Sequence, residues 1–251
     1  MNIVSKVNEW RALRQQWANQ EIGFVPTMGN LHAGHLSLYQ RANIENQLVV
    51  ASIFVNPTQF NQSSDFNHYP RTLDNDIKLL AENGVDYLFL PTENEMYPDQ
   101  YQIQVTETED SKQLEGEFRP GHFNGMLTVV LKLLNLVQPT RAYFGEKDYQ
   151  QFLLVKKMVT ALFLPIEIVP CATIRADDQL ALSSRNSRLS LKQRKQAAQF
   201  PSLLQSDLAI TDIVTALTAQ GFKVDYVQEK WGRKLAAVWL DEVRLIDNIP
   251  S

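Results

Sequence analysis

The stretch PTMGNLHAGH, residues 26–35, decides the fold of the first part of the chain. An apolar run, residues 22–25, precedes it, and an amphipathic segment, residues 36–44, follows it. This pattern predicts a strand, a glycine-containing turn and a helix whose first turn holds His32 and His35, which share a helix face at this spacing. A helix N-terminus offers unpaired N–H groups and a positive dipole end, so the site favours an anion, above all a phosphate. Gly34 lies between the histidines and would let a ligand approach the backbone closely.

Two other interpretations of the histidine pair are weaker. A bare H-x-x-H is more often a surface feature than a site, and only the strand–turn–helix context raises its significance. As a zinc motif it is poor, because metalloprotease histidines lie four residues apart with a glutamate between them.

Composition limits the possible classes of protein. The chain has 251 residues, 44% of them hydrophobic, and a net charge of −4, which is typical of a soluble protein with one large domain or two unequal ones. No apolar run reaches membrane-spanning length, residues 1–17 do not look like a signal peptide, and the acidic balance argues against nucleic-acid binding. The single cysteine, Cys171, is expected to be buried and inert, which fits a cytoplasmic location. A polyanionic substrate would need a local basic cluster, and the candidates are Lys147, Arg175, Arg185 and Arg188.

Up to about residue 170, segments with strand and helix character alternate. The strands are short and apolar on both faces, as expected for a covered parallel sheet, and the βαβα order implies right-handed crossovers. The predicted fold class is therefore α/β, a Rossmann-like parallel sheet with helices on both faces, whose ligands bind beyond the carboxyl ends of the strands. The expected strands are residues 22–25, 48–55, 87–90, 142–144 and 166–169, and the expected helices are 32–46, 72–83, 125–137 and 149–163.

The last part of the chain has a different pattern. Two helices are expected, at residues 191–208 and 211–220, followed by three short alternating runs at 223–227, 235–240 and 243–246. Helices followed by adjacent strands indicate a small α+β domain with an antiparallel sheet. We place the domain boundary near Arg175, with residues 1–174 as the Rossmann-like domain and 175–251 as a small C-terminal lid domain.

Two strand-end loops contain further polar candidates. Asn56 and Gln59, in FVNPTQF, offer donor and acceptor groups that suit a small hydroxyl-bearing acid, although Asn-Pro is also an ordinary turn. Lys147, in FGEKDYQQ, could reach a phosphate as a mobile point charge, whereas Asp148 is more safely a helix cap.

A third loop, LSSRN, provides two hydroxyls and a guanidinium that could bind an anion, or it is a polar linker before a cap at Ser190. The chain contains no G-x-x-x-x-G-K-[ST], G-x-G-x-x-G or G-x-S-x-G motif, so neither a Walker-type ATPase, an NAD enzyme nor an α/β-hydrolase is supported.

Six stretches together resemble one family. PTMGNLHAGH, FVNPTQF, YPRT, RPGHF, FGEKDYQQ and LSSRN occur in the order typical of the pantothenate synthetases (pantoate–β-alanine ligases) of the HIGH-motif nucleotidyltransferase superfamily. The resemblance covers residues 1 to about 190 and the closing RLIDN. It implies an enzyme of coenzyme A biosynthesis that joins pantoate to β-alanine and splits ATP to AMP and diphosphate through a pantoyl adenylate. It also implies Mg²⁺ held by the ATP phosphates without protein ligands, and a homodimer.

The resemblance assigns roles to individual positions. The implied catalytic residues are His32, His35, Lys147, Ser183, Ser184 and Arg185. The implied ATP-binding residues are these six together with Met28, Gly145, Asp148, Ile174 and Leu182. The implied pantoate-binding residues are Pro26, Met28, Asn56, Gln59 and Gln151.

The sequence departs from the family pattern in two places, and two alternative functions compete with the resemblance. Leu182 replaces the usual methionine, a change that conserves volume and should be mild. The second domain, about 75 residues, is shorter than expected, which puts the extent of the lid in doubt. Another HIGH-motif nucleotidyltransferase would share the histidine turn but would not need NPTQF. A nucleotide- or RNA-binding protein without catalysis is disfavoured because both histidines, Lys147 and the Ser-Ser-Arg loop are present.

Overall fold

The computed structural model describes residues 1–61 and 63–251, which divide into two compact units. The first unit comprises residues 1–31, 35–145 and 150–171, and the second comprises 32–34, 146–149 and 172–251. The chain thus enters the second unit twice before residue 172, once at His32 and once at the turn that contains Lys147. The domain boundary expected near Arg175 stays a proposal.

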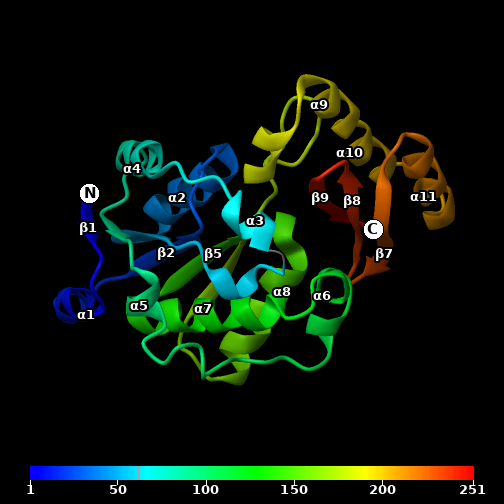
Figure 1. Cartoon of the computed structure of the whole chain (residues 1–251). Coiled ribbons are helices and arrows are strands. Elements are labelled where there is room, and N and C mark those ends of the chain that lie inside the picture. The colour runs from blue at the N-terminus through cyan, green and yellow to red at the C-terminus, as the bar shows by residue number, and fades with distance from the viewer. Residues whose placement is uncertain (62) are drawn as a thin grey trace. The chain divides into compact units, whose positions relative to one another are not determined.

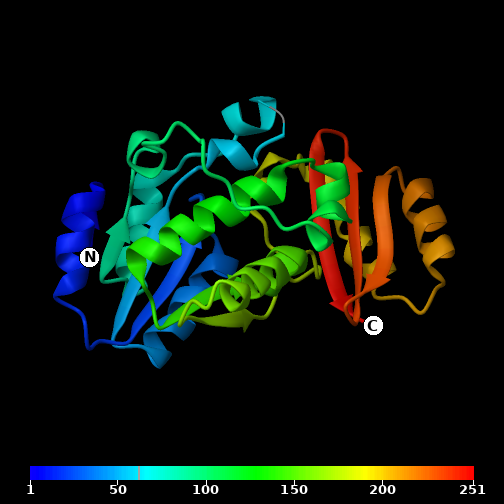
Figure 2. The ribbon, with the colours of Figure 1, turned by 90° about the horizontal axis from the view of Figure 1, so that it is seen from below.

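The first unit is built on a parallel sheet of six strands in the order β1-β4-β3-β2-β5-β6. The predicted Rossmann-like fold is confirmed. Helices α2 and α4 lie on one face of the sheet, and α7 and α8 lie on the other (Figures 1 and 2). The strands are β1 (Asn2–Val4), β2 (Ile22–Thr27), β3 (Leu48–Ile53), β4 (Tyr87–Phe89), β5 (Arg141–Gly145) and β6 (Glu167–Cys171).

The helices of this unit agree with the predicted ones to within three residues at each end. The structure adds α1, whose buried Trp10 donates its indole N–H to the carbonyl of Leu136 at 2.9 Å, and several short helices. The helices are α1 (Val7–Gln15), α2 (Ala33–Glu45), η1 (Pro57–Gln59), α3 (Ser63–Asn67), α4 (Leu73–Glu82), α5 (Glu93–Met96), η2 (Asp110–Lys112), α6 (Glu115–Phe118), α7 (His122–Val137) and α8 (Tyr149–Ala161, with Tyr149 in the second unit).

Helix α7 and the short helix η1 lie against each other because of one glycine. A Cβ on Gly125 would lie 2.3 Å from the carbonyl oxygen of Thr58 and 2.8 Å from the amide nitrogen of Gln59. Real atoms do not approach so closely, so only glycine permits this contact. The end of β3 is thereby held directly on the N-terminal part of α7.

The second unit contains an antiparallel sheet of three strands, as predicted, with β7 (Lys223–Lys230), β8 (Arg233–Leu240) and β9 (Val243–Pro250). Its hydrophobic core joins the sheet to its helices through residues such as Phe200, Leu217 and Ala236. The strands are longer than expected because two-residue hairpins join them, with Trp231, Gly232 and Asp241 at positive φ.

The single helix expected at residues 191–208 was wrong. The structure has two helices there, α9 (Leu191–Ala197) and α10 (Gln199–Leu204), which precede α11 (Ile210–Ala219). Pro201 explains the break, because a proline ring inside a helix clashes with the carbonyl four residues earlier, here that of Ala197. The remaining helix of this unit is η4 (Ser184–Arg188), and η3 (Glu146–Asp148) contains Lys147.

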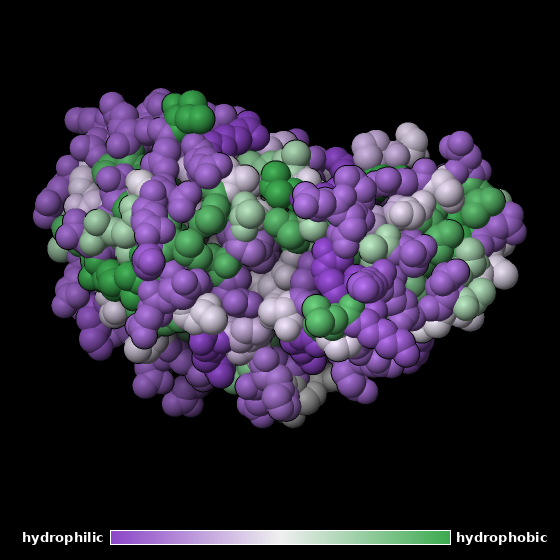
Figure 3. All heavy atoms as spheres, turned by 90° about the horizontal axis from the view of Figure 1, so that it is seen from above, coloured by the Kyte–Doolittle hydropathy of each residue, from purple (hydrophilic) through white to green (hydrophobic). Residues whose placement is uncertain are grey.

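Hydrophilic side chains dominate the face in Figure 3, where hydrophobic ones form scattered groups. Within the described residues, no helix has both the length and the apolar character needed to cross a membrane.

Candidate active site

The turn between β2 and α2 is held by a buried carboxylate. Asp76, on α4, is 1% exposed and accepts the backbone N–H groups of Asn30 and Leu31 at 2.9 and 2.8 Å. The hydroxyl of Thr72 donates to the same carboxylate at 3.1 Å. Gly29 has a φ of +82° and a Cβ there would lie 3.0 Å from Asp76, so the glycine is required by conformation and by space. The shape of the turn that leads into His32 therefore depends on a helix more than forty residues later in the chain.

His32 directly precedes α2, and its ring nitrogens have distinct roles. Nδ1 accepts the N–H of Gly34 at 3.1 Å, as an N-cap side chain does. Burial first, and then the charge of Lys147, lowers the pKa of His32 from 6.5 to about 4, while Asp148 acts in the opposite direction. The imidazole is therefore neutral at pH 7, and because Nδ1 is the acceptor, the proton resides on Nε2. His32 can donate one hydrogen bond to an anionic oxygen without itself carrying charge.

Gly34 leaves room for this arrangement. A Cβ at residue 34 would lie 2.9 Å from Cε1 and 3.0 Å from Nδ1 of His32, and 3.7 Å from Cβ of Leu182. The missing side chain thus preserves the cap, and the LSSRN loop lies near this segment within the second unit.

The turn that holds Lys147 is fixed by the last strand of the chain. The side-chain amide of Asn248 donates to the carbonyls of Glu146 and Lys147 at 2.9 and 3.0 Å. Arg233 bonds Asn248 at 2.8 Å and the carboxylate of Glu146 at 2.7 Å. The Lys147 side chain itself is 17% exposed, with its ammonium 3.8 Å from Asp148. The closing RLIDN stretch therefore positions a candidate phosphate-binding lysine, a role that its sequence alone did not indicate.

Arg175 is not available as a phosphate ligand. Its guanidinium forms a two-point ion pair with Asp247, at 2.7 and 2.9 Å, and donates further to the carbonyls of Gln179 and Asn248. The Asp247 side chain is 1% exposed, so the pair is structural. The suggestion that Arg175 belongs to the anion-binding cluster was wrong, because its guanidinium is already paired with Asp247. The sequence did not indicate this pair because the two residues lie 72 positions apart.

The LSSRN loop forms the short helix η4, and Ser183 caps it by accepting the N–H of Arg185 at 3.2 Å. The N–H of Leu182 donates to the carbonyl of Ile174 at 3.0 Å, which joins two of the expected ATP-binding positions. The expected cap at Ser190 is also present, as a full capping box with Gln193. The loop is thus an ordered element of the second unit.

Three of the expected pantoate-binding residues lie together in the first unit. The amide nitrogen of Gln59 is 3.1 Å from Sδ of Met28, and Asn56 donates to Oε1 of Gln59 at 3.1 Å. Pro26 lies on β2, two residues before Met28, and Gln151 lies in the first turn of α8. His35, in the first turn of α2, and Gly145, at the end of β5, also belong to this unit.

His122, from RPGHF, has a structural role. It is buried, and its Nδ1 lies 2.8 Å from the backbone carbonyl of Gln59, while Nε2 lies 3.1 Å from Arg119. Arg119 in turn lies 3.8 Å from the carboxylate of Glu115. This chain of contacts holds the backbone carbonyl of Gln59, at the end of η1, in place.

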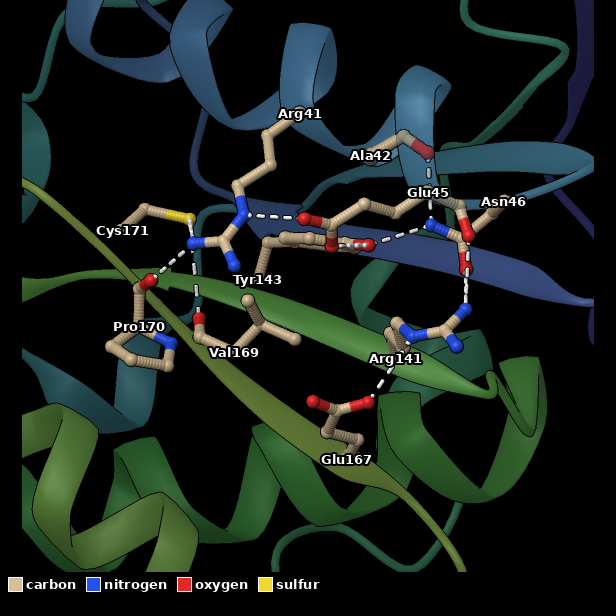
Figure 4. A network of polar contacts seen from close by, with 10 residues as sticks. All are labelled: Arg41, Ala42, Glu45, Asn46, Arg141, Tyr143, Glu167, Val169, Pro170 and Cys171. Carbon is tan, nitrogen blue, oxygen red and sulfur yellow. Dashed lines mark hydrogen bonds and ion pairs between the residues drawn. The ribbon is translucent and has the colours of Figure 1, made fainter.

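A polar network fastens α2 to the sheet (Figure 4). Arg41 pairs with Glu45 at 2.8 Å and donates to the carbonyl of Pro170 at 2.6 Å, and Glu45 accepts the hydroxyl of Tyr143 at 2.8 Å. The hydrogen bond from Arg41 is the main reason why the pKa of Glu45 is lowered. Cys171 is buried, as predicted, with its sulfur 3.8 Å from Arg41. The network fixes the helix whose first turn contains His35 to strands β5 and β6.

Comparison with known proteins identifies the family. Residues 2–250 match the family described as pantoate-beta-alanine ligase. A pantothenate synthetase of Legionella pneumophila is 51% identical over 99% of both chains, and one of Coxiella burnetii is 50% identical over 99% of this chain and 96% of its own. A pantoate-beta-alanine ligase from Francisella tularensis, solved with beta-gamma ATP and beta-alanine, superposes with a TM-score of 0.96 at 42% identity, covering 100% of this chain and 97% of its own.

The chain belongs to the pantoate–β-alanine ligase family. It is therefore an ATP-using ligase of pantothenate biosynthesis, as the sequence predicted. The second domain had looked short for the family. The match, however, covers 99% of the Legionella protein and 96% of the Coxiella protein, so this chain is not truncated relative to these two relatives.

The lowered pKa of His32 predicts a particular pH dependence of stability. Between pH 6.5 and about 4 the unfolded histidine binds a proton that the folded one does not, so this residue lowers the free energy of unfolding as the pH falls through that range. We expect the stability difference between wild type and His32→Gln to shift in favour of the variant on going from pH 7 to pH 4.5, as measured by urea unfolding. A difference that stays constant with pH would mean that His32 titrates normally in the folded ligase.

Proposed function

We propose that this ligase forms pantothenate in two steps, through an enzyme-bound pantoyl adenylate. In the first step a carboxylate oxygen of pantoate attacks the α-phosphorus of ATP, and diphosphate leaves with the electrons of the broken P–O bond. In the second step the amine of β-alanine attacks the acyl carbon, and AMP leaves. Activation is needed because a free carboxylate is a poor acyl donor, whereas adenylate is a good leaving group.

One observation carries the assignment of the phosphate-binding residues. His32 is neutral with its proton on Nε2, and the positive charge of Lys147, in the same unit, helps to lower its pKa. A neutral donor and a nearby ammonium suit a polyphosphate, whose charge grows on the leaving diphosphate as the bond breaks. We assign His32, His35, Lys147, Ser183, Ser184 and Arg185 to the phosphates and the transition state.

The nucleotide and pantoate subsites extend this assignment. We assign Gly145, Asp148, Ile174 and Leu182 to the adenosine part of ATP, and Met28 to both ATP and pantoate. Pantoate is assigned to Pro26, Met28, Asn56, Gln59 and Gln151, and the cluster of Gln59 with Met28 and Asn56 supports this choice. No proton-abstracting residue is assigned for β-alanine, since positioning of the amine beside an activated acyl group is sufficient.

Mg²⁺ is proposed as a companion of ATP. In the parts of the chain that the structure describes, residues 1–61 and 63–251, no group of three His, Cys, Asp or Glu side chains could hold a metal ion. Mg²⁺ prefers phosphate oxygens and water over a protein cage, and bound to ATP it would neutralise charge on the phosphates. A homodimer and a cytoplasmic location complete the proposal.

A product assay tests the two-step reaction. Pure protein is incubated with ATP, Mg²⁺ and pantoate, with and without β-alanine, and the products are identified by mass spectrometry. We expect pantothenate and AMP only when both acids are present, and pantoyl adenylate in the tube without β-alanine. Pantothenate formation with no trace of the adenylate, even after rapid acid quenching, would contradict the proposed intermediate while leaving the ligase activity intact.

A further inference from the structure

Asn56 uses its whole hydrogen-bonding capacity at the end of β3. The residue is 1% exposed. Its Nδ2 donates to the carbonyl of Gly125 and to Oε1 of Gln59, both at 3.1 Å. Its Oδ1 accepts the hydroxyls of Tyr97 at 2.7 Å and Thr58 at 3.0 Å. Two N–H groups and two lone pairs are all that a side-chain amide offers.

The direction of the Asn56 amide follows from one partner. Oxygen and nitrogen of an amide have nearly the same shape, so orientation must be deduced from the network. A hydroxyl can donate or accept, and therefore Tyr97 and Thr58 would tolerate either orientation. The carbonyl of Gly125 can only accept, so the atom that faces it at 3.1 Å must be the nitrogen. Both hydroxyls must then act as donors to Oδ1.

The same logic passes to Gln59. The second N–H of Asn56 points at the Gln59 amide, and the atom that receives it must be the oxygen. The Gln59 nitrogen is consequently turned away from Asn56 and lies 3.1 Å from Sδ of Met28. A thioether is a weak acceptor. A carboxylate or hydroxyl oxygen of a substrate would be a stronger partner for this N–H₂ group.

The Tyr97 ring is fixed on its other sides, so its hydroxyl holds the Asn56 amide in the orientation that the Gly125 carbonyl sets. Its ring is 4% exposed, and it lies 4.2 Å from the ammonium of Lys132 and 4.3 Å from the ring of Tyr101. Lys132 is itself fixed by the carbonyl of Met96 and by Asp99, at 2.9 and 3.1 Å. The Tyr97 hydroxyl therefore reaches Asn56 without a flexible side chain between them.

We propose that Tyr97 is a positioning residue which, through Asn56, holds the Gln59 amide with its N–H₂ group toward an oxygen of pantoate. The inference rests on the proposed role of Gln59 in binding pantoate. A side chain that is already held in its binding orientation loses no rotamer freedom when the substrate arrives, so the relay favours pantoate binding. The relay also disfavours the flipped Gln59 amide, which would present its oxygen to an anionic substrate.

Tyr97→Phe tests the relay with little change of shape. Loss of one buried hydrogen bond predicts a rise in KM for pantoate of roughly 3- to 10-fold. The KM values for ATP and β-alanine should stay near those of the wild type, because the relay ends at Gln59. The matched control is Tyr101→Phe, since the Tyr101 hydroxyl bonds Glu93 and not Asn56. Thr58→Val removes the other hydroxyl donor and should act in the same direction, which keeps the test usable if Tyr97→Phe fails to fold.

A double-mutant cycle separates a relay from general loosening of the fold. If Tyr97 acts through the Gln59 amide, Tyr97→Phe should have no further effect on KM for pantoate in a Gln59→Ala background. Additive effects, or equal changes for all three substrates, would overturn the relay. An unchanged KM for pantoate in Gln59→Ala alone would instead overturn the proposed role of Gln59, and the relay with it. A raised KM in Gln59→Ala with a wild-type KM in both Tyr97→Phe and Thr58→Val would remove only the relay.

Discussion

Lys147→Ala is expected to slow formation of pantoyl adenylate by on the order of 10²-fold or more while the protein stays folded. The ammonium is the charge that most directly affects His32 after burial, so it lies where an anion would be stabilised. The turn itself should survive, because Asn248 holds the carbonyls of Glu146 and Lys147 through the backbone. Pantoate-dependent exchange of labelled diphosphate into ATP measures this step alone.

The control for this variant is Lys156→Ala, a lysine that is exposed on α8. It makes the same change of charge and should leave the exchange rate unaltered. In Lys147→Ala the pKa of His32 should rise, since one of the two causes that lower it has been removed, and an NMR titration of the imidazole would show this. A folded Lys147→Ala protein with near-normal exchange would exclude Lys147 from the mechanism.

Asp76→Asn is expected to destabilise the ligase by about 2–4 kcal/mol, because it weakens charge-assisted hydrogen bonds in a buried site. Both carboxylate oxygens accept a backbone N–H, from Asn30 and from Leu31. An asparagine can offer an acceptor to only one of them and must turn its own N–H₂ group toward the other. The turn before His32 should loosen, so the diphosphate exchange rate should also fall.

Asp74→Asn provides the comparison, since Asp74 lies on the same helix but is exposed. Urea unfolding at pH 7 measures the stability of both variants. Equal stability and equal exchange rates for the two would show that Asp76 does not hold the turn.

Much of the first unit could be predicted from residue patterns. Short apolar runs such as residues 22–25 and 48–55 became β2 and β3, and the helix expected after the histidine turn became α2. The prediction failed where the pattern was polar or the segment short. Strand β1 has three residues and offers no periodicity, and the helix expected at 191–208 is divided near Pro201.

The sequence proposed members for the candidate site, but it did not indicate which contacts hold them in place. Nothing in the local sequence links Arg175 to Asp247, and this pairing withdrew Arg175 from the anion-binding candidates. Asn248 was visible only as part of a closing motif, and its contact with the Lys147 turn bridges about a hundred residues. Asp76 looked like one of several charges on an amphipathic helix.

The sequence by itself determined the parallel α/β architecture and the antiparallel C-terminal sheet, because the periodicity of apolar residues is a local property. Its motifs also proposed the residues that would face the substrates. Only the tertiary structure decided that His32 is neutral with its proton on Nε2, and that the Gln59 amide presents its nitrogen. These properties depend on burial and on hydrogen-bond partners such as Gly125, which reach the site from distant parts of the chain. Protonation and amide orientation are properties of an environment, and folding creates that environment.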